Sequence, residues 1–318
     1  MPLKKTPKNI QRLTIANPQT GLSVDWLNIN SPGKAEIEFL RKTYNFKLTH
    51  LHASSAKSSS ERPVIIHEDG YLFMILHFPV REDGGQNAKV AAAEIEFFIG
   101  HGFIITLPSA SLEPLNDFFN LCKKDSASLL SHEFASSAIL LYEILNKLLS
   151  YSFVLLDKNS LAIAEAEKII LSDEQKKAAG LILNLRHNLI NMRKIVQNHK
   201  NIIKQLMAMP SSLIPADQLK KYYGRLVEQT KNIWEILENQ REMVEVLRDS
   251  HESLANYKLS SIMKTLTIFY VIFSSLTLIA AIFSMNTAAG AANFWLILAG
   301  MAVAGLVMFL IFKIKKWL

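Results

Sequence analysis

The chain has 318 residues, of which 49% are hydrophobic, with one cysteine and a formal net charge of +7. A single cysteine excludes an intrachain disulfide and any cysteine-based metal site within one chain. The positive charge is typical of solvated helix faces or of a surface that meets anionic lipid headgroups. The sequence has no nucleic-acid motif, no P-loop, no glycine-rich dinucleotide turn and no nucleophile–base arrangement, so neither nucleic-acid binding nor enzyme activity is predicted.

Residues 1–125 predict a mixed α/β domain. Apolar residues alternate in Leu13–Ile15 and Leu22–Ile29, and a helix is predicted from an N-cap at Ser31 to Tyr44. Strands rich in β-branched and aromatic residues follow, and short glycine-containing turns between them indicate antiparallel hairpins. Helices flanking these strands predict an αβα layered domain. The four strands are Val64–His67, Tyr71–Phe78, Glu94–Ile99 and Phe103–Thr106.

Two small polar groups lie in this domain. His50 and His52 share one side of a predicted strand at a spacing that can bind metal, but nothing nearby completes a site. Surface histidines are therefore the favoured interpretation. Glu94 and Glu96 alternate along another strand, which predicts a solvated face.

Residues 126–212 predict a long antiparallel helical hairpin made of two runs, His132–Leu171 and Asp173–Met207. Residues 213–263 predict a coiled-coil stalk, because apolar residues recur every seven positions with a second row offset by three. A helix this long needs partners along its seam, so we expect a parallel homo-oligomeric bundle. Gln240 either sets the register or marks a solvated gap. The rows are Leu219, Leu226, Ile233, Leu247 and Leu254, then Tyr222, Ile236 and Met243.

Two charge-free apolar runs follow, Leu266–Phe283 and Phe294–Phe312. Each has close to the ~20 residues that a helix needs to cross a bilayer, so a transmembrane hairpin is predicted. Lysines flank its outer ends and are absent from its loop, and no signal peptide is predicted at the N-terminus. Both termini are therefore expected on the cytoplasmic side of an inner membrane. The predicted interface anchors are Lys264, Lys315, Lys316 and Trp317.

One face of the first run predicts a pore lining if the stalk seam continues in phase. Met263 and Leu266 would then form a dry constriction that gates by dewetting, and Ser274 and Thr277 would offer neutral oxygens. Hydroxyl groups that only join helices are an alternative that the spacing leaves open. The whole predicted lining is Leu259, Met263, Leu266, Tyr270, Ser274, Thr277, Ala281 and Ser284.

The segment 261–286 reads SIMKTLTIFYVIFSSLTLIAAIFSMN. Its Met-Lys-x-Leu-Thr start, its Leu-Thr-x-Ile-Ala middle and its Ser-Met-Asn end resemble the CorA family of divalent-cation channels, whose own last motif is Gly-Met-Asn. The similarity covers nearly the whole chain in order. Further matches are Arg62-Pro63, Tyr71-Leu72-Phe73, Leu76–Pro79, Phe98-Ile99-Gly100, Ile105-Thr106, Leu112–Leu115 and the closing Lys315-Lys316-Trp317-Leu318.

The resemblance implies a funnel-shaped homopentamer, in which an αβα cytosolic domain precedes a stalk helix that becomes the pore helix and the second span surrounds the pore. It assigns Ser284, Met285 and Asn286 to the selectivity filter, with Asn286 receiving a hydrated metal ion. Such a filter suits Mg²⁺, which sheds water reluctantly. The implied partners are further copies of the chain, membrane lipid and divalent cations, with Mg²⁺ as transported ion and no covalently bound cofactor.

The chain departs from the family pattern at three places. Ser284 replaces the signature glycine, the outer loop 287–293 has no acidic residue, and Arg225 stands where the family has an acid that senses Mg²⁺ between subunits. Glu228 keeps one acid of that stretch, and Gln229 replaces its histidine. These changes put the cytosolic metal sensor in doubt and weaken electrostatic focusing at the outer mouth.

The leading hypothesis is divalent-cation transport through a CorA-type pore, with Mg²⁺ ahead of Co²⁺, Ni²⁺ and Zn²⁺. The alternative is a CorA-like paralogue that is non-conducting or differently selective and acts as a membrane scaffold or regulator. A third possibility is zinc transport of the related proton-coupled kind. The predicted segments are 1–125 (αβα domain), 126–212 (hairpin), 213–263 (stalk), 264–284 (pore helix), 285–293 (outer loop) and 294–318 (second span and basic tail).

Overall fold

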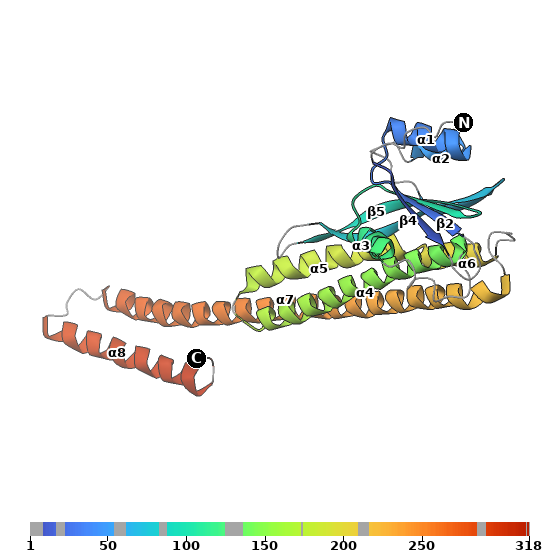
Figure 1. The fold of residues 1–318 in the computed structure, drawn as a ribbon. Coiled ribbons are helices and arrows are strands. Elements are labelled where there is room, and N and C mark those ends of the chain that lie inside the picture. The colour runs from blue at the N-terminus through green and yellow to red at the C-terminus, as the bar shows by residue number, and fades with distance from the viewer. Residues whose placement is uncertain are drawn as a thin grey trace. The chain divides into compact units, whose positions relative to one another are not determined.

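The computed structural model describes residues 9–16, 23–53, 62–82, 88–124, 136–172, 174–208, 216–284, 291–315 and 317. The chain divides into two compact units, Met1–Leu247 and Arg248–Leu318 (Figure 1). The first unit holds a sheet and most of the helices, and the second holds the two apolar helical segments.

A 6-stranded sheet forms the centre of the first unit, with strand order β1-β2-β6-β5-β4-β3. The pair β2 and β6 is parallel, and every other neighbouring pair is antiparallel. The hairpins predicted from the glycine-containing turns are therefore confirmed. The strands are β1 (Gln11–Ala16), β2 (Ser23–Asn28), β3 (Val64–Glu68), β4 (Tyr71–Glu82), β5 (Lys89–Gly100) and β6 (Phe103–Pro108).

Both faces of this sheet are covered, because β4 is buried without interruption from Tyr71 to Pro79. On one face, side chains of the strands join a cluster with α1 (Lys34–Tyr44) and α2 (Leu48–Ala53). On the other, Trp26 meets Phe118 and Phe119 of α3 (Glu113–Lys124), with ring centroids 5.6 and 4.9 Å apart. The predicted αβα layering is confirmed.

Ser31 is not the N-cap of α1, as the sequence pattern had predicted. The cap is Gly33, whose backbone N–H donates to the carboxylate of Glu36. Ser31 instead has a positive φ of 48°, and its hydroxyl donates to the carbonyl of Ser109. Its side chain holds the connection after β2 against the end of β6 and is not free to cap a helix.

The two polar groups of this domain also differ from prediction. His50 lies on helix α2, not on a strand, and it is buried, with its ring stacked on Phe73 at a centroid distance of 4.4 Å. Its Nδ1 lies 3.0 Å from the Tyr71 hydroxyl, so it is a packing residue. Glu96 is buried, and Glu94 lies 3.1 Å from His77, so the predicted solvated face is wrong.

The helical hairpin consists of α4 (Ser137–Ile170) and α5 (Gln175–Val196), which pack against each other and against the sheet. Ser136 caps α4 by accepting a hydrogen bond from the backbone of Ile139. The predicted second run does not continue unbroken to Met207. It stops at Val196, and a separate helix α6 (His199–Ala208) follows.

The break positions His199 in the core. Its ring is 1% exposed, its Nε2–H donates to the carbonyl of His77 at 2.6 Å, and it packs against Phe78. Its Nδ1 has no hydrogen-bond partner among the described residues. Burial lowers the pKa of His199 to about 4, since a second ring proton would be buried without an acceptor.

The first stretch of α7 (Ala216–Ser284) packs on α4 in the same chain. The Tyr223 hydroxyl donates to Ala138 O at 2.7 Å, and Gln240 Nε2 donates to Leu156 O and Ser160 Oγ at 2.7 and 2.8 Å. α7 is followed by α8 (Ala291–Ile314). The buried seam of α7 alternates steps of three and four residues: Tyr223, Leu226, Thr230, Ile233, Leu237, Gln240, Val244 and Leu247.

This seam corrects two expectations. The second buried row lies three residues before the first row, whereas the sequence pattern predicted it three residues after. The sequence did not reveal this row because one of its buried members, Thr230, is polar, while the predicted member Met243 is exposed. Thr230 is satisfied by donating its hydroxyl hydrogen to Val227 O at 2.7 Å. The seam is also filled within one chain, so its periodicity does not by itself require other copies. Gln240 bonds to α4 and is neither a solvated gap nor exposed.

We predict that stability falls as pH decreases because of His199. Its folded-state pKa is about 4, against an ordinary value of 6.5, so the unfolded chain binds more protons between these values. The stabilisation is present above pH 6.5 and is lost progressively as pH falls toward 4. At pH 5 the loss from this residue should be about 2 kcal/mol relative to pH 7.

Urea unfolding of the wild type and His199→Gln at pH 7 and pH 5 tests this. The variant should lose less stability on acidification than the wild type, whereas the exposed-histidine control His67→Gln should keep the wild-type pH dependence. Equal pH dependence in all three proteins would contradict the assignment.

Candidate functional site

The last part of α7 and all of α8 are apolar helices with little burial. By length and composition, three helices in the described chain could cross a membrane, namely α4, α7 and α8. In α4, 61% of the most apolar window is buried inside the protein, against 6% in α7 and 0% in α8. α4 is therefore a core helix, while α7 and α8 present apolar surface that a bilayer would cover.

The predicted lining residues share one exposed face of α7, since steps of three and four residues return to the same side of a helix. Ile268, about half a turn away from this face, is only 3% exposed. A Cβ built on Gly305 of α8 would lie 3.8 Å from Leu276, so α8 approaches α7 away from the lining face. The predicted lining residues, all of them exposed, are Leu259, Met263, Leu266, Tyr270, Ser274, Thr277, Ala281 and Ser284.

The sequence pattern predicted that this face continues the buried seam of the stalk, but it does not. Counting by sevens from Leu247 leads to Leu254, Ser261 and then Ile268. Counting back by sevens from Met263 and Leu266 leads instead to a row of acidic residues. That row comprises Glu235, Glu238, Glu242, Glu245, Asp249 and Glu252.

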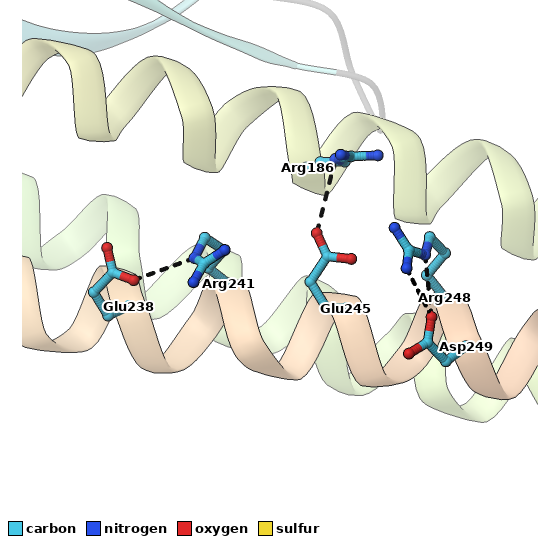
Figure 2. A network of polar contacts seen from close by, with 6 residues as sticks. All are labelled: Arg186, Glu238, Arg241, Glu245, Arg248 and Asp249. Atoms are coloured by element: carbon cyan, nitrogen blue, oxygen red, sulfur yellow. Dashed lines mark hydrogen bonds and ion pairs between the residues drawn. The ribbon is translucent and has the colours of Figure 1, made fainter.

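Arginines neutralise part of this acidic row (Figure 2). Arg193 of α5 lies 3.0 Å from Glu238, and Arg186 lies 4.0 Å from Glu245. Arg241 and Arg248 add pairs within α7, to Glu238 and Asp249. Sequence reasoning missed this ladder. The sequence held one signal for these ion pairs. Arg186 and Arg193 on α5 are seven residues apart, and so are their partners Glu245 and Glu238 on α7.

Four hydroxyl groups in this segment, those of Thr265, Thr267, Ser275 and Thr277, make hydrogen bonds within their own helix. Thr277 Oγ1 donates to Phe273 O at 2.8 Å, and Ser275 Oγ donates to Val271 O at 2.8 Å. With its hydrogen engaged, the Thr277 oxygen presents lone pairs on the lining face. It is therefore an acceptor that suits a cation or its hydrating water.

Ser284 is the last residue of α7 and is exposed. Among described non-glycine residues, positive φ occurs at Ser31 and Asn45, so Ser284 has no backbone strain that would demand glycine. Met285, Asn286 and the loop as far as residue 290 lie outside the described residues, and their filter role stays a prediction.

The stalk residues that depart from the family pattern lie around the α4 contact. Gln229 Nε2 donates to Asn146 Oδ1 at 2.8 Å, while Arg225 is exposed. Glu228 lies 4.0 Å from Lys231. Within the described part of the chain, no group of three or more His, Cys, Asp or Glu side chains could hold a metal ion.

The predicted anchors lie at the start of the first apolar segment and at the end of the second, away from the loop that joins them. Lys264 follows Met263 and lies about a third of a turn from the lining face, so it is not a lining residue. Lys315 is exposed, and the Trp317 ring lies 6.0 Å from that of Phe312. Lys316 lies outside the described residues, and the anchoring role of all four stays a prediction.

Known proteins provide an independent comparison. The family model described as "CorA-like Mg2+ transporter protein" matches residues 21–316. The cobalt/magnesium transport protein CorA of Thermotoga maritima is 31% identical over 184 residues, which are 56% of this chain and 52% of that protein. The protein of the same name from Methanocaldococcus jannaschii is 22% identical over 299 residues, 92% of this chain and 91% of that one.

A solved structure agrees with this assignment. The complete CorA magnesium transporter from M. jannaschii superposes with a TM-score of 0.80 at 21% identity, covering 93% of this chain and 92% of that one. The chain therefore belongs to the CorA family, which consists of membrane transporters of divalent cations and not of enzymes.

We predict that the α5–α7 ladder stabilises the first unit through one arginine in particular. Arg193 pairs with Glu238 and lies over the Trp234 ring at 4.8 Å, so Arg193→Ala should cost about 1 kcal/mol of unfolding free energy. Arg241→Ala removes only a pair within one helix and should cost less than about 0.5 kcal/mol. Urea unfolding followed by circular dichroism measures both, and equal losses would refute the difference.

Proposed function

We propose that the chain forms a pentameric pore that carries divalent cations, with Mg²⁺ foremost, down the membrane potential. The observation that carries the proposal is the apolar surface of the last part of α7, which is almost wholly exposed and includes every described residue of the lining face. Such a face needs other copies of the same helix around an axis, or lipid, to cover it. A potential of 100 mV contributes about 2.3 kcal/mol per charge to cation entry.

In this proposal the pore begins with a dry ring and ends with a polar one. Met263 and Leu266 are 56% and 62% exposed on the lining face, so five copies would form an apolar constriction that excludes water when narrow. Ser274 and Thr277 follow as neutral oxygens. The filter is Ser284, Met285 and Asn286, whose amide and carbonyl oxygens would receive a hydrated Mg²⁺ without stripping its water.

The membrane arrangement follows from the charges that flank the two apolar segments. Lys264, Lys315 and Lys316 would anchor the cytoplasmic interface, with Trp317 beside them at headgroup depth. Both termini would then be cytoplasmic, and the acid-free loop 287–293 would lie outside an inner membrane. The segment boundaries after residues 125, 212, 263, 284 and 293 are proposed from the strand, helix, heptad and apolar patterns along the chain.

We predict that Asn286→Ala abolishes divalent flux. With the purified protein in liposomes that contain a Mg²⁺-sensitive dye, the wild type should conduct and the variant should lose at least about tenfold of the rate, because the filter loses its side-chain oxygen. Ser284→Gly should change the rate little, since Ser284 has ordinary helical backbone.

The opposite outcome would favour the alternative function. No wild-type flux, with flux appearing in Ser284→Gly, would mean that the filter is closed by its first residue. The acid-free loop and Arg225 would then mark a CorA-like protein that acts as a scaffold or regulator. Flux of Zn²⁺ that depends on a proton gradient would indicate the proton-coupled kind of transport.

We predict that Leu266→Ser increases leak. A hydroxyl in place of an isobutyl group keeps the constriction wet, so basal Mg²⁺ flux should rise several-fold. Phe269→Ser is the matched control, because Phe269 is 56% exposed but lies about a quarter turn from the lining face. A larger increase in Phe269→Ser than in Leu266→Ser would show that the lining face has been assigned to the wrong side of α7.

A further inference from the structure

The first unit contains a groove that takes no part in the ion pathway. It has a volume of about 770 Å³ and lies between α4 and α5, with the end of β4 and the start of β5 at its rim. Its lining comes from elements that are far apart in the sequence but meet on one side of the hairpin (Figure 1).

Facing sides of the two helices form the walls. On each helix, three of the lining positions recur at steps of four and three residues, which is one side of a helix. Ala162 on one wall and Gly180 on the other are small, so the helices leave open space between them. The wall positions are Lys158, Ala162 and Glu165 on α4, and Gly180, Asn184 and His187 on α5.

Gly180 has no explanation in the packing of the chain. It lies inside α5, where glycine is the least favourable residue after proline. A Cβ at this position would meet nothing within 4 Å, so no neighbouring side chain requires its absence. The missing side chain instead enlarges the groove.

The groove is strongly cationic. Arg81, Lys89, Lys158 and Lys177 line it, against one lining carboxylate, Glu165. Lys177 pairs with Glu174 at 3.2 Å, but Lys89 and Lys158 form no ion pair within the described ranges of the chain. Because Lys89 and Lys158 line the same groove, their like charges repel one another, and an anion bound there would remove that repulsion.

One of these cations is held in place by the helix behind it. Asn188 of α5 accepts from Val90 N at 3.0 Å and donates to Ala88 O at 3.1 Å, and Asn191 donates to Val90 O at 3.0 Å. Lys89 lies between the two residues whose backbones are bonded in this way. The backbone at Lys89 is therefore fixed at the rim before any ligand binds, and only its exposed side chain has to be ordered on binding.

The groove also offers apolar surface. Leu161 and Leu183 line it and are 72% and 54% exposed, although both are large aliphatic residues. A smaller cavity of about 80 Å³ shares Lys158, Ala162 and Asn184 with it and extends toward buried Asn159. A ligand that carries both a polyanion and a flat or apolar group would use all of these surfaces.

We propose that this groove binds a nucleoside polyphosphate, with the phosphates on Lys89 and Lys158 and the base against Leu161 and Leu183. Asn184 and Glu165 would hydrogen-bond the polar edge of the base or the ribose. The ligand would bridge α4, which carries the seam of α7, and α5, which carries the arginine ladder, so its binding would stiffen the helices that support α7.

Binding is measured on the purified full-length protein in detergent, by isothermal titration in EDTA so that transported cations do not interfere. ATP should bind saturably and about tenfold more tightly than tripolyphosphate, adenosine should not bind, and affinity should fall as salt rises. Lys158→Gln should weaken ATP binding about tenfold, and Gly180→Leu, which fills the groove, should weaken it at least as much.

Lys200→Gln, an exposed lysine on α6 with the same change of charge, is the control and should alter affinity less than about twofold. Thermal melting by circular dichroism shows whether Gly180→Leu remains folded, and Lys158→Gln tests the groove independently of it. Equal loss in Lys200→Gln, tripolyphosphate binding as tight as that of ATP, or no ATP binding would overturn the proposal. So would Lys158-dependent binding to phosphatidylglycerol vesicles without binding of ATP. Because no flux is measured, this result is independent of whether the pore conducts.

Discussion

The packing of α7 on α4 is the constraint on which the rest of the structure depends. α7 is 69 residues long, and no isolated helix of that length is held by its own backbone propensity. Tyr223, Leu226 and Ile233 bury one side of it almost completely against the same chain. Three hydrogen-bonded points, at Tyr223, Gln229 and Gln240, fix its register along α4. Because one side is used in this way, the opposite side remains available for another role.

Much of the sheet could be predicted from the sequence because its strands have strong local signals. β4 begins with an unbroken apolar run from Tyr71 to Leu76, and Gly70 and Gly102 mark the turns before β4 and between β5 and β6. Ser31 misled the prediction of α1 because a serine before a proline resembles an N-cap, and only the tertiary contact with Ser109 shows its actual use. The end of α5 at Val196 could not be predicted, because no Pro or Gly follows it as a signal of helix termination.

The candidate site was predicted less evenly. Spacing placed the lining residues on one face, and composition placed two spans at the C-terminal end, because both signals are local to one helix. The phase between stalk and span was wrong, because the first row of the seam, continued by sevens from Leu247, leads to Ile268 and not to the lining residues. The ion pairs of Arg186 and Arg193 could not be predicted either, since they depend on which helix lies beside α7.

The face of α7 that carries the acidic row and then the predicted lining residues changes from charged to apolar to hydroxyl-bearing along the helix. It carries carboxylates as far as Glu252, then Leu259 begins an apolar stretch that ends in hydroxyl groups. In the proposed pore these parts have separate tasks: carboxylates gather cations by long-range attraction, an apolar ring controls water, and neutral oxygens contact the hydration shell. The arginines of α5 compensate two of the carboxylates, so the attraction of this face for cations depends on how α5 is held. α5 in turn forms one wall of the cationic groove, so the arginines that pair with this face of α7 and the proposed ligand site lie on the same helix.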